Sequence, residues 1–171
     1  MSDNRRIGDD QLYVHFITFS CDRRRRLLDM DHPKRLLPGE LNRLLKAHQA
    51  KCVGFVLMPN HVHALIWLSQ TGQLSQFMQH WKRDSSTAIR RWYSEQQVEY
   101  VKQHDLGDRL WTPKYYAFQI HSQEKLVEKL TYMHMNPVRA GLATRPTDWK
   151  WSSARWYENR KPVGVPLDWI D

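Results

Sequence analysis

The sequence lacks the features of membrane, secreted and disulfide-stabilised proteins. None of its apolar runs approaches the roughly 20 residues that cross a bilayer, and the N-terminus has no apolar signal-peptide core. Two cysteines, Cys21 and Cys52, are too few for a disulfide framework or a cysteine-rich zinc site. Repeats, low-complexity tracts and linkers are also missing. We therefore expect one cytoplasmic domain over 1–171, with an N-terminal arm at 1–12 and a C-terminal extension at 143–171.

Acidic residues are scarce relative to basic ones. The chain has 26 Lys and Arg against 18 Asp and Glu, a net charge of +8, which favours a polyanionic partner such as nucleic acid. Each candidate cation either contacts a phosphate or belongs to an ordinary solvated surface. The candidates for DNA contact are Arg5, Arg6, Arg23, Arg24, Arg25, Arg26, Lys82, Arg83, Arg90, Arg91, Lys125 and Lys129.

Runs of β-branched and aromatic residues alternate with segments of helical periodicity. Strands are predicted at 13–19, on both sides of the Pro59-Asn60 turn within 55–67, and at 115–120. Helices are predicted at 33–50, from Gln73 onward beside the histidine pair described below, and at 123–135, where Asn136-Pro137 is expected to end or redirect the helix. Residues 94–110 are expected to be a loop. The order predicts an α+β fold, a ferredoxin-like split βαβ sandwich with one antiparallel sheet and its helices on one face.

Two histidines follow the Pro59-Asn60 turn in an alternating strand. His61 and His63 point to the same side of that strand, about 7 Å apart along it, so both imidazoles can bind one divalent metal ion. Two imidazoles leave coordination positions open, which indicates a reactive metal site. The plainer interpretation is a pair of histidines on the solvent side of a strand.

The third predicted helix has a polar flank. Leu126, Leu130 and Met133 form one apolar stripe, while Tyr132 and Asn136 lie four residues apart beside it, on the side of Lys125 and Lys129. The Asn136 oxygen can complete a metal-ligand set with the two imidazoles. A phenol, with a pKa of about 10, attacks phosphate only when the electrophile is polarised or the phenolate is favoured. A divalent ion and the neighbouring lysines supply these two effects.

These residues resemble a known family. Met58-Pro59-Asn60-His61-Val62-His63 resembles the HUH motif (His, hydrophobic, His) of single-tyrosine transposases of bacterial insertion sequences. The segment Tyr132-Met133-His134-Met135-Asn136-Pro137-Val138-Arg139-Ala140-Gly141-Leu142, followed by Asp148-Trp149-Lys150-Trp151-Ser152-Ser153, resembles the branch called REP-associated tyrosine transposases. The likeness extends from about residue 13 to residue 157.

The resemblance implies a ferredoxin-like HUH nuclease domain that acts, as a monomer or homodimer, on single-stranded DNA folded into hairpins. It implies magnesium or manganese bound by His61, His63 and Asn136, and Tyr132 as the nucleophile. Attack on a DNA phosphate would give a 5′-phosphotyrosine and a free 3′-OH, and the reverse step would rejoin the strand without ATP.

Two alternatives remain open from the residues alone. A non-catalytic nucleic-acid-binding module would bind through aromatic side chains, independently of metal and without a product. A metal phosphoesterase with water as its nucleophile would leave free DNA ends and no protein adduct.

Overall fold

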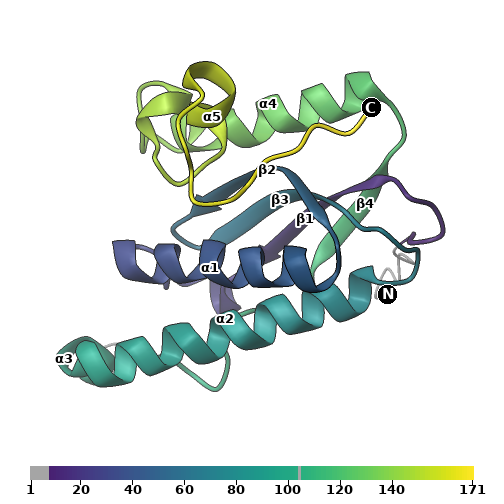
Figure 1. Cartoon of the computed structure of the whole chain (residues 1–171). Helices are drawn as coiled ribbons and strands as arrows, with labels where there is room; N and C mark the ends of the chain where they lie inside the picture. Colours follow the sequence, from purple (N-terminus) through teal and green to yellow (C-terminus); the bar gives the residue numbers. More distant parts are fainter. Residues whose placement is uncertain (1–7, 104) are drawn as a thin grey trace, which may run out of the picture.

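Four strands form one antiparallel sheet in the order β2-β3-β1-β4, which is the ferredoxin-like arrangement predicted from the sequence. The computed structural model describes residues 8–103 and 105–171 (Figure 1). Its elements, in chain order, are β1 (Val14–Ser20), η1 (Asp22–Arg24), α1 (Asp31–Ala47), β2 (Lys51–Met58), β3 (His61–Trp67), α2 (Leu74–Gln96), α3 (Val98–Gln103), β4 (Tyr116–Ile120), α4 (Gln123–Arg139), η2 (Pro146–Asp148) and α5 (Ala154–Asn159).

Helices cover both faces of this sheet, so the expectation of helices on one face is wrong. In Figure 1, α1 and α2 lie on one side of the strands, and α4 lies on the other with α5. Both faces of the inner strands are apolar, and β2 is buried at every position from Cys52 to Met58. Such continuous burial requires a cover on each side. Periodicity identifies the stripe of α4 that packs on the sheet, but it does not distinguish the two faces.

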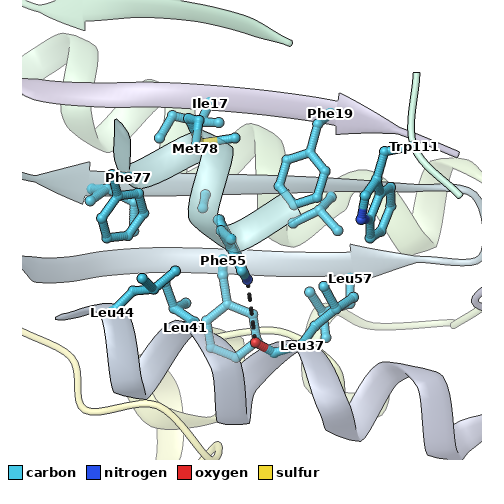
Figure 2. Close-up of a cluster of buried hydrophobic side chains, with 14 of the residues drawn as sticks. Ile17, Phe19, Leu37, Leu41, Leu44, Phe55, Leu57, Phe77, Met78 and Trp111 are labelled. Atoms are coloured by element: carbon cyan, nitrogen blue, oxygen red, sulfur yellow. Dashed lines mark hydrogen bonds between the residues drawn. The ribbon is translucent and has the colours of Figure 1, made fainter. Parts of the chain in front are cut away.

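The face under α1 and α2 carries the larger core. Ile17, Phe19 and Phe55 from the strands pack there against Leu37 and Phe77 from the helices, and all five are almost fully buried (Figure 2). The face under α4 has a smaller cluster, in which Leu126, Leu130 and Met133 pack against strand residues, as the apolar stripe predicted.

Helix α4 does not end at Asn136-Pro137. It continues to Arg139, and Pro137 is buried inside its last turn. The helix is terminated by Gly141, which has φ of +73°. The amide of Gly141 donates to the Val138 carbonyl and the amide of Leu142 donates to the Pro137 carbonyl, a Schellman motif. This end keeps the Tyr132–Asn136 turn inside regular helix.

The predicted loop at 94–110 is partly helical. α2 extends to Gln96, and the short helix α3 follows at Val98–Gln103. The polar composition of this stretch led to the prediction of a loop. In the structure, Tyr100 stacks on the buried Tyr93 with ring centroids 5.2 Å apart, and this contact holds α3 against α2.

Residues after α4 protect the exposed edge of β2. The Leu57 amide donates to the Trp151 carbonyl, and the indole Nε1 of Trp149 donates to the Leu57 carbonyl. Ser152 forms a bridge with Val56. An uncovered edge strand would invite pairing with another chain, so this segment completes the sheet. None of the described helices combines the length and the apolar character that crossing a membrane requires.

Candidate functional site

The histidine pair lies on the face of the sheet that α4 covers. The Pro59-Asn60 turn starts β3 at His61, and the alternation of the strand directs His61 and His63 to the same side. Their ring centroids are 4.8 Å apart. His63 is only 7% exposed, while His61 is partly exposed. The pair therefore lies at the boundary between the core and the solvent, and is neither fully exposed nor fully buried.

Each imidazole is oriented by a second side chain. Asn60 Oδ1 lies 2.7 Å from His61 Nδ1, and Thr18 Oγ1, across the β1–β3 ladder, lies 2.7 Å from His63 Nδ1. Because an amide oxygen only accepts, His61 Nδ1 carries the proton and Nε2 keeps its lone pair. The Thr18 hydroxyl can fix His63 in the same way. Partners of this kind orient metal-binding histidines in many proteins.

Both imidazoles are neutral at physiological pH. Burial, with a smaller contribution from Arg24, lowers the pKa of His61 to about 4. Burial also lowers the pKa of His63 to about 3, helped by the adjacent His61 and by the cations Arg139 and Lys129. A neutral imidazole is the form that binds metal. The site thus presents two donor nitrogens without any competing proton at pH 7.

Helix α4 brings Tyr132 and Asn136 to this pair. Ser122 caps the helix by accepting from the Lys125 amide at 3.1 Å. Asn136 Nδ2 lies 3.4 Å from His61 Nε2, and the Tyr132 ring lies 5.7 Å from the His63 ring between centroids. The tyrosine and the carboxamide predicted to converge on the two imidazoles do so.

Close approach of α4 to the sheet depends on a glycine in β2. A Cβ at Gly54 would overlap Leu130 Cδ1 and would lie 3.2 Å from Met133 Cε. Gly54 therefore lets the apolar stripe of α4 sit directly on the strand. Its role was not predicted from the sequence, because a glycine inside an apolar run gives no indication of its partner.

Two cations flank the Tyr132 ring. Lys129 Nζ lies 5.5 Å and the Arg139 guanidinium carbon 4.5 Å from its centroid, and Arg139 Nη2 donates to the Tyr132 carbonyl at 2.7 Å. Tyr132 itself is 43% exposed. Sequence reasoning proposed Lys129 but missed Arg139. Its position seven residues after Tyr132, two helical turns along the same face, was the available signal.

The remaining candidate cations on the described helices do not contact the Tyr132 ring. Lys125, one turn before Lys129, pairs with Glu128 at 3.1 Å. Lys82 donates to the carbonyls of residues 112–114, and burial lowers its pKa. Arg83 pairs with Asp84, Arg90 donates to the Gly107 carbonyl, and Arg91 is exposed. These α2 residues lie across the sheet from Tyr132, not beside the histidine pair as expected.

The arginine run after β1 divides into two kinds of residue. Arg25 is tied to backbone carbonyls, among them that of Arg109, and Arg26 pairs with Asp29 at 2.9 Å. Arg23 and Arg24 are exposed, and both have positive φ. Arg5 and Arg6 lie outside the described residues.

The possible metal donors are nitrogens and an amide oxygen. Within 8–103 and 105–171, no cluster of three or more His, Cys, Asp or Glu side chains could hold a metal ion. The set at α4 consists of two histidines and one asparagine, so it carries no charge of its own.

The chain is similar to known proteins over the segment that contains the histidine pair, Tyr132 and Asn136. Residues 9–136 match the family model described as "Transposase IS200 like". A protein of Haemophilus influenzae, named as a REP-associated tyrosine transposase, is 22% identical over an alignment of 151 residues; the alignment covers 81% of this chain and 81% of that protein.

Solved structures share the fold. A REP-associated tyrosine transposase bound to a REP hairpin superposes with a TM-score of 0.74 at 19% identity, covering 100% of this chain and 94% of the other. A transposase structure from Deinococcus radiodurans R1 gives a TM-score of 0.51 at 19% identity, over 74% of this chain and 94% of the other.

Proposed function

The chain belongs to the IS200-like transposase family, and from this premise we propose that it cuts and rejoins single-stranded DNA at hairpin-forming palindromes through a tyrosine–DNA intermediate. The family match confirms the resemblance predicted from the motifs at 58–63 and 132–142. The related protein whose structure contains a REP hairpin supports hairpin DNA as the substrate. We place this activity in the bacterial cytoplasm, where the chromosome lies.

The observation that carries the proposal is the convergence of α4 with β3. The Tyr132 ring lies beside His63, and Asn136 lies beside His61, so a phenol and three metal-ligand candidates share one partly exposed surface. A structural role explains this set poorly. A rim tyrosine needs no paired, oriented imidazoles next to its ring.

The residues fit a divalent cation such as magnesium or manganese. His61 Nε2, His63 Nε2 and the Asn136 Oδ1 oxygen would hold it, and Asn60 and Thr18 would fix the two rings. Three neutral ligands leave the charge of the cation available to an anionic substrate. When bound, the ion would polarise a phosphate oxygen and make the phosphorus more electrophilic.

The reaction exchanges one phosphate ester for another. The Tyr132 oxygen, after losing its proton, attacks the phosphorus, and the P–O3′ bond breaks. The leaving 3′-oxygen takes up a proton, so that one end of the strand is a 3′-OH, while the 5′-phosphate of the other end stays on the tyrosine. The reverse attack by a 3′-OH restores the phosphodiester and frees the phenol, so the energy of the bond is conserved.

Lys129 and Arg139 give the site a positive field for this substrate. Both lie within 6 Å of the Tyr132 ring; Arg139 is exposed, and Lys129 is partly exposed. Cations at this position attract the phosphate to be cut and oppose the negative charge that develops during transfer. Arg139 also holds the backbone of Tyr132 through its hydrogen bond to the carbonyl.

A denaturing gel tests the proposal directly. Wild-type protein is incubated with end-labelled hairpin DNA in magnesium, in manganese and in chelator, and a protease-sensitive, slowly migrating DNA band is expected with metal only. Tyr132→Phe should abolish that band and leave hairpin affinity within about twofold, because the ring and its contacts remain. Tyr116→Phe, which removes a hydroxyl from another half-exposed tyrosine, should leave the band unchanged.

The outcomes separate the three classes of function. Cut DNA without an adduct would identify water as the nucleophile and overturn the role of Tyr132. Binding without any product, unaffected by chelator, would identify a binding module. An adduct that persists in Tyr132→Phe would move the nucleophile elsewhere.

A further inference from the structure

A second surface feature lies on the opposite face of the sheet, between α1 and the C-terminal segment. It is a cavity of about 480 Å³, lined by apolar groups that include Phe55, Pro162 and the Trp151 indole, and by the cations Arg35, Lys150 and Arg155. The volume is that of an ordinary small-ligand pocket. None of these residues belongs to the site around Tyr132.

We propose that this cavity, hereafter the Trp151 cavity, binds an unpaired nucleobase of the single strand that flanks the hairpin. The inference rests on the proposed function, because it assumes that single-stranded DNA is the substrate. It assigns to the protein a base-binding subsite separate from the place where the strand is cut.

The backbone fixes Trp151 at the edge of the sheet. Its carbonyl accepts from the Leu57 amide at 2.8 Å, and two residues later the Ser153 amide donates to the Phe55 carbonyl at 3.0 Å. The Trp151 indole is partly buried against the core on the α1 side. A ring anchored on both sides by main-chain hydrogen bonds is a rigid platform, and a rigid aromatic surface loses little entropy when a base stacks on it.

Three cations surround the same indole. Lys150 Nζ lies 4.8 Å, Lys34 Nζ 5.3 Å and the Arg35 guanidinium carbon 6.0 Å from the ring. Lys34 is buried and donates to three backbone carbonyls, so it supports the ring from inside. Arg35 and Lys150 are largely exposed and share the single carboxylate of Asp31. The positive charge around the ring exceeds what Asp31 neutralises.

The lining of the cavity is complementary to a nucleotide. Its described residues include three cations and no acid, around a mostly apolar floor. A flat apolar base joined to phosphates matches both parts, whereas an acidic peptide would not use the aromatic floor. Asn42 also lines the cavity, and its Nδ2 donates to the Gly164 carbonyl at 2.7 Å, which joins α1 to the C-terminal segment across the cavity wall.

A cavity of similar size near η1 makes a useful contrast. Its described lining combines Asp22, Asp105 and Asp108 with Arg23, Arg25 and Arg109, in a volume of about 490 Å³. Its charges cancel, and it has no aromatic ring. The combination of aromatic floor and uncompensated positive charge therefore distinguishes the Trp151 cavity.

The test compares three DNA ligands that share one hairpin stem: the bare hairpin, the hairpin with an unpaired flank, and the same flank made of abasic nucleotides. Fluorescence anisotropy gives their affinities. In Trp151→Leu we expect the affinity for the base-containing flank to fall by about 5- to 150-fold, because stacking on one aromatic side chain has this value. Affinities for the bare hairpin and the abasic flank should stay within about twofold.

Two matched controls and a second variant keep the test decisive. Trp169→Leu, at another partly exposed tryptophan, should behave as wild type. Lys150→Gln removes one exposed cation of an ion pair at the cavity, and Lys102→Gln removes one from the Lys102–Glu99 pair far along the chain. Only Lys150→Gln should reduce the salt dependence of binding to both flanked hairpins, by about one counterion. It also replaces Trp151→Leu if thermal unfolding shows that variant to be misfolded.

The results distinguish this inference from the proposed function. If wild type forms the tyrosine adduct but folded Trp151→Leu and Lys150→Gln bind all three ligands as wild type does, the Trp151 cavity is not a subsite and the proposed function stands. Equal losses on all three ligands would also overturn the subsite. If wild type neither binds hairpin DNA nor forms an adduct, both proposals fall.

Discussion

Polar side chains on the two faces of the sheet differ in their exposure to solvent. Under α1 and α2, two of the large buried polar side chains bond within the chain: Trp111 Nε1 donates to Ser85 Oγ at 3.1 Å, and the Tyr93 hydroxyl donates to the Leu27 carbonyl at 2.8 Å. Under α4, His61, Tyr132 and Asn136 remain partly open to solvent.

The difference follows from how the helices cover each face. The long helices α1 and α2 cover one side of the sheet, whereas α4 lies on the other side with the short helix α5 and leaves one flank exposed (Figure 1). A partly covered face can hold desolvated imidazoles next to water and substrate. The sealed face supplies the stability that allows this, so stability and activity should respond to mutation separately.

The largest expected effect is on the sealed face. Phe77→Ala removes a fully buried ring and should lower the free energy of unfolding by about 3–5 kcal/mol, measured by urea titration. Adduct formation per folded molecule at 25 °C should stay close to wild type. A folded but inactive Phe77→Ala would show that the two faces are coupled. Val127→Ala, at an exposed position of α4, is the control and should change stability by less than about 0.5 kcal/mol.

The next effect is on the open face. His63→Ala should reduce metal-dependent adduct formation by at least about 100-fold, since loss of a ligand must exceed the 10- to 100-fold cost of losing its hydrogen-bonded partner. Thr18→Val, which removes only that partner, should fall in the 10- to 100-fold range. The free energy of unfolding should also decrease in His63→Ala, because the change removes a buried ring that stacks on Phe16 and leaves the Thr18 hydroxyl without its partner, so activity is scored per folded molecule. Unchanged activity in His63→Ala would exclude the histidine pair from the reaction.

Acid should destabilise the open face. An unfolded histidine has a pKa of about 6.5, while the folded pKa is about 4 for His61 and about 3 for His63. Between these values the unfolded state binds more protons, so stability falls as pH decreases through this window, by up to about 1.4 kcal/mol per pH unit for each residue. Urea titrations of the metal-free protein from pH 7 to pH 4 measure the slope. His63→Gln should flatten it, and an equal slope in both proteins would contradict the burial of His63.

The smallest effect separates two lysines of one helix. Lys129 faces the Tyr132 ring, and Lys125 pairs with Glu128 at the surface. Lys129→Gln should slow single-turnover adduct formation by about fivefold, equivalent to ~1 kcal/mol. Lys125→Gln should change it by less than about twofold, as expected for an exposed ion pair. Equal effects of the two substitutions would mean that only net charge matters.

The sequence predicted the parts of the site that depend on local periodicity. Alternation in β3 put His61 and His63 on one side, and the helical spacing of Leu126, Leu130 and Met133 left Tyr132 and Asn136 on a flank. Both patterns depend only on neighbours within a few residues. The strand order was also predictable, because the succession of elements permits few topologies.

Contacts between distant segments were not predictable. Thr18 orients His63 only because β1 pairs with β3 in one particular register. The end of α4 was predicted at Asn136-Pro137 because proline disfavours helix in the residue before it, yet the buried Pro137 and the Schellman motif at Gly141 extend it to Arg139. The face covered by α4 depends on how the whole chain packs.

Gly54 has no side chain, and this leaves room between β2 and α4 for Leu130 and Met133. Tyr132 and Asn136 belong to α4, whereas both imidazoles belong to the sheet. The distance between helix and sheet therefore affects both the Tyr132–His63 and the Asn136–His61 separations. A methyl group at position 54 would meet the ends of the Leu130 and Met133 side chains, so these two side chains would have to repack for Tyr132 and Asn136 to keep their places. The packing of α4 over the site therefore depends in part on β2, an edge strand that contributes no side chain to the site.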